Sequence, residues 1–170
     1  AAWLGVAALG CYLLLAINGD PAWGRLGTTL TIWGFLLPVF ATVAHRMLPF
    51  FTSAVIRGYV VHRPVWALRV LLAAGLGHGL FSFLDLARWL WLTDLPALVA
   101  SGHLAWRWWN RAVVSNRMVL VLHLAFAWVP VAFALFALQS LPGVLEPGAL
   151  GQAPMHALVI GFFSSMMIGM

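Results

Sequence analysis

Thr42-Val43-Ala44-His45-Arg46-Met47-Leu48-Pro49-Phe50-Phe51-Thr52 is the stretch that decides the fold, because it shows how a long apolar run ends. The run begins near Leu26 and is long enough to cross a membrane as a helix. It reaches a histidine, an arginine and then Pro49, past which we do not expect the helix to continue unperturbed. The stretch therefore predicts a membrane-spanning helix that ends near Arg46.

Polar and helix-loosening residues lie on one face of this predicted helix. They follow one another at spacings of 7, 4 and 3, which places them on a shared face: Thr31, Pro38, Thr42 and His45. Lipid cannot satisfy such a stripe, so it should face other helices. We therefore expect His45 to point into a bundle, near one membrane surface.

The composition excludes a soluble fold. Of the 170 residues, 64% are hydrophobic and 8% are charged, whereas a soluble domain has about 25% charged residues. The nine basic residues are all arginine and cluster at the ends of apolar runs, which is typical of topology signals rather than of nucleic-acid binding. The single cysteine, Cys11, excludes a disulfide framework. The sequence thus predicts an integral membrane protein whose surroundings are the lipid bilayer.

We predict an all-α, polytopic transmembrane bundle that forms a single domain over residues 1–170. Six apolar runs are expected to be helical, namely residues 1–17, 26–46, 65–84, 86–106, 118–138 and 155–170. Residues 50–62 mix aromatic side chains with Arg57 and are expected to lie along the membrane interface. Because apolar runs reach both ends of the sequence, we expect these helices to be part of a larger bundle.

The distribution of arginines predicts the orientation of the bundle. If every run crosses once, seven arginines fall on one side: Arg46, Arg57, Arg63, Arg69, Arg107, Arg111 and Arg117. The other side receives Arg25 and Arg88 together with Asp20, Asp85 and Glu146. Arginines accumulate in cytoplasmic loops, so we expect the connections at residues 50–61 and 108–116 to face the cytoplasm.

Six histidines among so few ionisable residues are the main sign of function. Ionisable side chains inside a membrane are costly, and histidine is the commonest metal ligand and an axial ligand of haem iron. His78 lies in the third run, in the glycine-rich stretch Gly75-Leu76-Gly77-His78-Gly79. It is either a metal ligand or a packing residue with a hydrogen bond to a neighbouring helix.

His123 and His156 are the strongest ligand candidates, and His45 is the third. Each lies near the end of a spanning run, beside small residues that leave room for a flat cofactor. A neutral imidazole with no acidic neighbour in sequence suits axial ligation, although a hydrogen-bonded core histidine is the alternative for all three. We expect His45 and His123 near the cytoplasmic side and His156 near the other. This spread favours two haems, or a haem and a copper, over one metal site.

The remaining candidate ligands have simpler interpretations. His103, with Arg107 four residues later, fits an interfacial pair whose polar tips reach toward water. His62 fits a solvated loop. Met167 is expected on the helical face of His156, where a thioether would suit Cu(I), although methionines mostly pack. No hydrolytic constellation and no phosphate-binding glycine loop is present in the sequence.

Three motifs follow one another along the chain. They are Trp33-Gly34-Phe35-Leu36-Leu37-Pro38-Val39-Phe40 leading into His45–Thr52, then Leu120-Val121-Leu122-His123-Leu124-Ala125-Phe126-Ala127-Trp128-Val129-Pro130, and His156-Ala157-Leu158-Val159-Ile160-Gly161 running to Met166. Together these motifs resemble the NnrS family, and their common order makes the resemblance fairly specific. Within it, His123 and His156 match histidines of the family motifs, and His45 adjoins the motif around Pro49.

The resemblance implies a multi-pass protein of the bacterial inner membrane that is associated with haem and copper. It also implies a role in the response to nitric oxide and nitrosative stress in denitrifying-type metabolism, with nitric oxide as a further partner. Two alternatives remain open from the residues alone. One is a secondary transporter or channel, and the other is a haem-bearing electron carrier of respiration.

Overall fold

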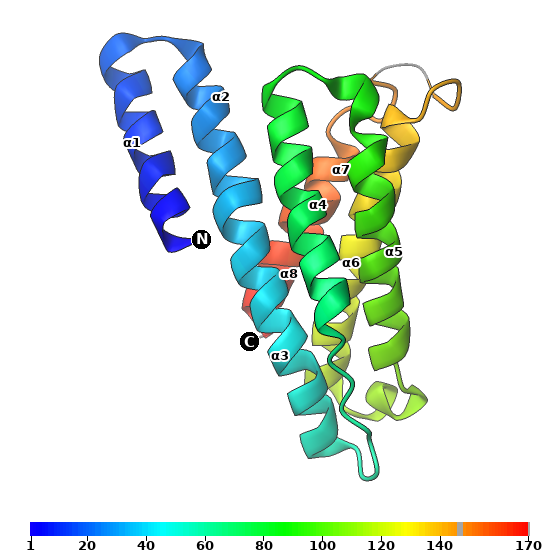
Figure 1. Ribbon diagram of the computed structural model, residues 1–170. Coiled ribbons are helices and arrows are strands. Elements are labelled where there is room, and N and C mark those ends of the chain that lie inside the picture. Colours follow the sequence, from blue (N-terminus) through cyan, green and yellow to red (C-terminus); the bar gives the residue numbers. More distant parts are fainter. Residues whose placement is uncertain (146–147, 170) are drawn as a thin grey trace.

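A computed structural model describes residues 1–145 and 148–169, which form an all-α bundle without a strand in that part of the chain (Figure 1). The elements in chain order are α1 (Ala2–Asn18), α2 (Pro21–Thr29), the π-helix η1 (Leu30–Leu36), α3 (Leu37–Val55), α4 (Val65–Phe83), the short 3-10 helix η2 (Ala87–Trp89), α5 (Trp91–Trp108), the 3-10 helix η3 (Arg111–Ser115), α6 (Arg117–Ser140), α7 (Ala153–His156), the π-helix η4 (Ala157–Ser164) and α8 (Ser165–Gly169). Two runs, α2–η1–α3 and α7–η4–α8, are continuous, so the described residues build six helical segments. The predicted fold class is confirmed.

Local chemistry accounts for the ends of several helices. Asp20 caps α2 by accepting a hydrogen bond from the Ala22 backbone N–H at 2.9 Å, and Pro21 occupies the first helical position. Asn116 caps α6 by accepting from the Val119 N–H. Gly19 ends α1 with a φ of 69°, a left-handed conformation that glycine adopts without strain.

Three helices are long and apolar enough to cross a membrane. They are Pro21–Val55, Val65–Phe83 and Arg117–Ser140, while Ala2–Asn18 and Ala153–Gly169 are apolar but shorter. Together with the composition, these helices identify a membrane protein.

The helices run alternately between two ends of the bundle (Figure 1). At one end α3 and α5 finish and α4 and α6 begin, and we call it the arginine-rich end because it carries Arg46, Arg57, Arg63, Arg69, Arg107, Arg111 and Arg117. The opposite end contains the connections between α1 and α2, between α4 and α5, and between α6 and α7. It carries Arg25, Arg88, Asp20 and Asp85, whereas Glu146 lies outside the described residues.

The core lies where α5 packs between α4 and α6, with α3 and η4 against α6. Alanines line these contacts and let the helices approach closely: Ala41 and Ala44 on α3, Ala97 and Ala100 on α5, and Ala125 and Ala132 on α6. Larger side chains fill the space between them, including the fully buried Trp108, Phe126, Phe133 and Phe162. The α1 helix packs on α2 and η1 at the edge of the bundle (Figure 1).

The expected end of the second helix near Arg46 is wrong. The helix begins at Pro21 and continues through the buried Pro49 to Val55, so most of the expected interfacial stretch of residues 50–62 is either helical or a turn. Proline removes one backbone donor, which leaves the helical bond to the His45 carbonyl unmade. Membrane helices tolerate this loss when neighbouring groups and helices support the backbone, and here the surrounding turns are buried against the bundle.

The expected polar stripe on this helix is only partly correct. His45 is buried, but Thr42 is exposed, and Thr31 and Pro38 are half-buried. The wider turns of η1 lie between Thr31 and Pro38, so the α-helical repeat does not hold across it. Thr31 also satisfies its hydroxyl within its own helix, by donating to the Gly27 carbonyl at 2.8 Å, and so requires no neighbour.

The fourth helix also begins later than expected. In place of a start at residue 86, the chain makes a turn and the short η2, and α5 begins at Trp91 and ends at Trp108. Asp85 takes a φ of 56° in this turn, a conformation that non-glycine residues rarely adopt. The other helix ends lie close to the expected ones.

Candidate functional site

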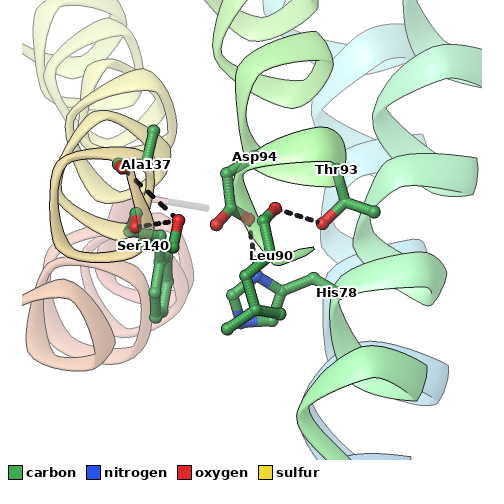
Figure 2. Close-up of polar contacts among 7 residues, drawn as sticks. His78, Leu90, Thr93, Asp94, Ala137 and Ser140 are labelled. Carbon is green, nitrogen blue, oxygen red and sulfur yellow. Dashed lines mark hydrogen bonds and ion pairs between the residues drawn. The ribbon is translucent and has the colours of Figure 1, made fainter. Parts of the chain in front are cut away.

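A buried histidine–aspartate pair joins α4 to α5 near the opposite end of the bundle (Figure 2). His78 Nδ1 lies 2.5 Å from Asp94 Oδ1, and the two side chains are 3% and 0% exposed. A carboxylate accepts the Nδ1 proton in such a bond, so the free lone pair of the neutral imidazole is on Nε2. A hydrogen bond to a neighbouring helix was one of the two alternatives that the sequence left open for His78, the other being a metal ligand, but this partner was not foreseen.

Aromatic rings enclose His78 on two sides. The Trp33 ring lies 4.1 Å from the imidazole centroid, and the Phe136 ring lies 4.5 Å away at an angle of 63°. Gly79 makes the approach of Trp33 possible, since a Cβ at that position would lie 2.7 Å from Trp33 Cβ. Gly75 has the same role against Leu37. The glycine-rich stretch therefore brings η1 against α4, as close packing predicts.

The second oxygen of Asp94 has no hydrogen-bond partner among the described residues, although it is fully buried. Figure 2 shows the Ser140 side chain of α6 beside this carboxylate. The Ser140 hydroxyl donates to the backbone of its own helix, with the Phe136 carbonyl at 2.9 Å and the Ala137 carbonyl at 3.3 Å. The site thus consists of an ionisable pair with one open acceptor and a hydroxyl next to it.

Sequence reasoning missed Asp94, because it counted the acidic residues mainly as loop residues. A usable signal was present. His78 and Asp94 are equidistant from Leu86, which lies in the connection between two antiparallel helices, so the two residues fall at the same level of the hairpin. Pairing residues in this way around each connection would have suggested the contact.

His45 is buried at the arginine-rich end, and its partner is a backbone group. Its Nε2–H donates to the Pro64 carbonyl at 3.3 Å, and its ring meets the edge of Trp108 at 5.9 Å. The adjacent connection is tied down by Arg63, which donates to the Arg46 carbonyl at 3.0 Å. In this arrangement the free lone pair of His45 is on Nδ1.

His123 is held by a hydroxyl from α3. Thr52 Oγ1 lies 3.0 Å from His123 Nε2 and 2.7 Å from the Leu48 carbonyl. A hydroxyl has a single proton, which here goes to the carbonyl, so His123 must donate from Nε2 and keep its lone pair on Nδ1. The ring of Trp109 stands nearly perpendicular to the imidazole at 6.0 Å.

His62 and His103 are half-buried and lie close to one another, with ring centroids 6.3 Å apart. His62 is therefore not a simply solvated loop residue, and its carbonyl also accepts from Trp108 Nε1 at 2.8 Å. In the same connection Tyr59 donates to the Trp108 carbonyl at 3.3 Å, and burial raises the pKa of Tyr59 above its usual value of 10.0.

His156 differs from the other candidates because it is exposed on the bundle surface. Its Nδ1–H donates to the Gln152 carbonyl at 2.8 Å, which fixes the tautomer and leaves Nε2 as a free acceptor. Met167, expected on the same face, is 68% exposed, and Met170 lies outside the described residues.

The structure brings some of the predicted site residues together and separates others. His45 and His123 lie at the arginine-rich end with His62 and His103, whereas His78 lies toward the opposite end. His156 also lies toward that opposite end, on a different helix. Within the described part of the chain, no group of three or more histidine, cysteine or acidic side chains is arranged to hold a metal ion.

Two cavities flank the His78–Asp94 pair. A cavity of about 490 Å³ between α2, α4 and α7 is lined by Trp33, the residue that stacks on His78. A larger cavity of about 1270 Å³, next to the connection after α6, is lined by Ser140, the residue beside Asp94. Arg88 and Gln139 add polar groups to the larger cavity, and Trp89 and Trp91 add aromatic ones.

Comparison with known proteins agrees with the motifs. No curated protein and no solved structure matches the chain. A family model described as NnrS protein matches residues 1–170, the whole of this sequence.

Proposed function

This chain belongs to the NnrS family, and from that membership we propose that it is part of a haem- and copper-binding protein of the bacterial inner membrane. Family membership supports a role in the response to nitric oxide in general, and we assign this chain to protection against nitrosative stress in denitrifying-type metabolism. The observation that carries the proposal is the match of the family model over every residue of the sequence.

His156 is the residue that best fits an axial haem ligand. Its tautomer is fixed by the bond from Nδ1 to the Gln152 carbonyl, which is the usual support of a ligating histidine. Its Nε2 is free, and the side chain is exposed on a helix that would otherwise present an ionisable group to lipid. A haem bound there would supply an iron able to bind nitric oxide.

His123 and His45 are the next candidates, in that order. Both use Nε2 for a hydrogen bond, His123 to Thr52 and His45 to the Pro64 carbonyl. Each would ligate a metal either through Nδ1 or after giving up that bond. Since the described residues form no three-ligand group, we propose that the remaining haem and copper ligands come from elsewhere in the protein.

We leave His78 out of this ligand set. Its Nδ1 is bonded to Asp94, and Trp33 and Phe136 pack against its ring. In the part of the chain that the structure describes, no third metal-ligating side chain is grouped with His78 and Asp94.

Absorption spectra of the purified full-length protein, oxidised and reduced, test the proposal together with copper analysis. We expect a haem Soret band that is lost or shifted in His156→Ala and partly restored by added imidazole, with smaller changes in His123→Ala and His45→Ala. His103→Ala serves as a control, because it replaces a histidine that we do not place in the ligand set. Unchanged haem and copper content in all three candidate variants would show that the ligands lie elsewhere.

Cysteine labelling tests the proposed orientation in the inner membrane. In a Cys11→Ala background, Ala149→Cys should react with an impermeant reagent outside intact cells, because Ala149 is exposed at the opposite end. Ser115→Cys, exposed at the arginine-rich end, should react only after the membrane is opened. The reverse pattern would place the arginine-rich end outside.

A further inference from the structure

We propose that His78 and Asp94 form a proton-binding site that exchanges its proton with the larger cavity at the opposite end of the bundle through the Ser140 hydroxyl. The ligand of this site is a proton, and the site is separate from the proposed metal ligands. Three features carry the proposal: the isolation of the pair, the open oxygen of Asp94, and the cavity on the other side of Ser140.

The pair is buried away from the other charges of the bundle. It is surrounded by α4, α5, η1 and α6, whose remaining titratable side chains, Arg69, His103, Arg107, Arg117 and His123, all lie toward the arginine-rich end. The only ionisable groups at the level of the pair on these elements are therefore its own two members. The charged side chains of the nearest connection, Asp85 and Arg88, are exposed and line the larger cavity. A buried carboxylate is costly without a compensating cation, so a proton shared between His78 and Asp94 is the simplest source of compensation.

Asp94 Oδ2 offers the place where a proton can arrive. It is fully buried and has no partner among the described residues, and the Ser140 hydroxyl lies beside it. A hydroxyl can donate one hydrogen bond while it accepts others, which a link in a proton chain requires. When Ser140 turns from the Phe136 carbonyl toward Asp94, its proton passes to Oδ2, and a hydronium ion in the cavity returns one to Oγ and becomes a neutral water. One proton enters the pair, Ser140 is unchanged, and the pair changes from a net charge of −1 to neutral.

The cavity on the Ser140 side is the better route to water. The smaller cavity is lined by Trp33, which packs on His78 but whose indole N–H donates and cannot accept a proton. The larger cavity is lined by Ser140 itself and carries the polar side chains of Arg88 and Gln139. A polar cavity of this size holds several waters, which can extend the chain to the surface.

Infrared spectroscopy of the full-length protein in lipid nanodiscs tests the binding of the proton. Between about pH 4 and about pH 10, which spans the ordinary range of carboxyl and imidazole groups, a carboxyl C=O band should appear on the acid side and vanish on the basic side. Asp94→Asn should remove that band, and Asp20→Asn, which changes an exposed aspartate of the same end that lines neither cavity, should keep it. A band that is absent over this range in the wild type, or that disappears in Asp20→Asn instead, overturns the proposal.

Hydrogen–deuterium exchange of the same band tests the route. On transfer into D₂O, Ser140→Ala should slow the exchange by about tenfold or more, equivalent to about 1.4 kcal/mol, and Ser140→Thr should exchange nearly as fast as the wild type because it keeps a hydroxyl. Both Ser140 variants retain His78 and Asp94, so this measurement remains decisive even if Asp94→Asn does not fold. Equal exchange rates in the alanine and threonine variants would overturn the role of Ser140.

Two tryptophan substitutions, one that lines the larger cavity and one far from it, complete the test. Ala87→Trp introduces a bulky ring at an exposed position that lines the larger cavity, and it should slow the exchange. Ala112→Trp makes the same change at an exposed 3-10 position of the arginine-rich end and should leave the rate unchanged. If both variants exchange at the wild-type rate, water reaches the pair by another route and the proposal is wrong.

Discussion

The two ends of the bundle hold their buried histidines in different ways. Toward the opposite end, His78 is bonded to a carboxylate, Asp94, and is enclosed by rings that glycines allow to approach. At the arginine-rich end, His45 and His123 are bonded to neutral oxygens, a backbone carbonyl and the Thr52 hydroxyl. The first arrangement combines two ionisable groups in one buried unit, whereas the second gives each imidazole a neutral hydrogen-bond acceptor near a surface rich in arginine.

This difference shows that a buried histidine cannot be assigned a role from its own position. The partner decides which nitrogen keeps its lone pair and whether the site can hold an extra proton. For His78 the partner can itself take up a proton, and for His45 and His123 it cannot. Removing partners one at a time is therefore the direct way to test the comparison.

The largest effect is expected from breaking the His78–Asp94 pair. Asp94→Ala or His78→Ala leaves one buried polar group without its partner, which should lower the free energy of unfolding by about 3–5 kcal/mol. The double variant His78→Leu/Asp94→Leu should recover much of that loss, because apolar residues often replace a buried pair without cost. Denaturant titrations followed by tryptophan fluorescence measure the three values.

Asp85→Asn is the control for this prediction, since Asp85 pairs with Arg25 through side chains that are 77% and 55% exposed. Asparagine removes the charge but still tolerates the positive φ of this position, so the stability should change only slightly. If Asp94→Ala is no more destabilising than Asp85→Asn, the buried pair does not stabilise this end of the bundle.

A smaller loss is expected where the glycine contact between α4 and η1 is filled. Gly79→Ala would place a Cβ 2.7 Å from Trp33 Cβ, and such overpacking typically costs about 1–3 kcal/mol. Gly102→Ala, in the middle of α5, meets no atom within 4 Å and should be neutral or stabilising. The same titrations separate the two outcomes, and equal stabilities would contradict the close approach of the helices.

At the arginine-rich end, the hydrogen bond to His123 should contribute less than the ionic pair. Thr52→Val removes the hydroxyl that accepts from His123 and should cost about 1 kcal/mol. Thr42→Val makes the same change at an exposed position of the same helix and should have little effect. A Thr52→Val variant as unstable as Asp94→Ala would remove the contrast between the two ends.

The smallest effect concerns the connection between α3 and α4. Tyr59→Phe removes a long hydrogen bond to the Trp108 carbonyl and should cost about 0.5 kcal/mol near neutral pH. Because burial raises the pKa of Tyr59, the folded protein holds this proton more tightly than the unfolded chain does. The stability of the wild type should therefore fall as the pH rises above 10.0, and it should fall less in Tyr59→Phe. Parallel slopes of stability against pH in the two proteins would contradict this.

The presence of the helices could be predicted from the sequence, but the continuation of the second helix beyond Arg46 and its rotation against its neighbours could not. The lengths of the apolar runs identified all six helical segments, because a helix that crosses a membrane needs a long enough apolar run within its own sequence. The path through Pro49 could not be foreseen, since it depends on neighbouring helices that support the interrupted backbone. The exposure of Thr42 depends in a similar way on the rotation of the helix against its neighbours.

The candidate site was predictable only in part, for a related reason. The glycines around His78 indicated close packing, but nothing in the sequence of that helix showed that a carboxylate would bond to the histidine. The partner, Asp94, comes from another helix, and so do Thr52 for His123 and Trp33 for His78. Contacts between helices depend on rotation and register, which the periodicity of a single segment does not contain.

The π-helix η1 has a consequence for how this sequence can change over time. Its hydrogen bonds reach one residue further than those of an α-helix, so it fits one extra residue into nearly the same rotation about the helix axis. Deleting a single residue between Leu30 and Leu36 would therefore restore the α-helical repeat and leave His45 and Thr52 facing the residues they bond to. The same deletion between Leu37 and Ala44 removes no extra residue, and it would turn every later side chain of the helix by about 100°, because each α-helical residue advances by that angle. We therefore expect a one-residue deletion to be tolerated within η1 and to be disruptive in the first turns of α3.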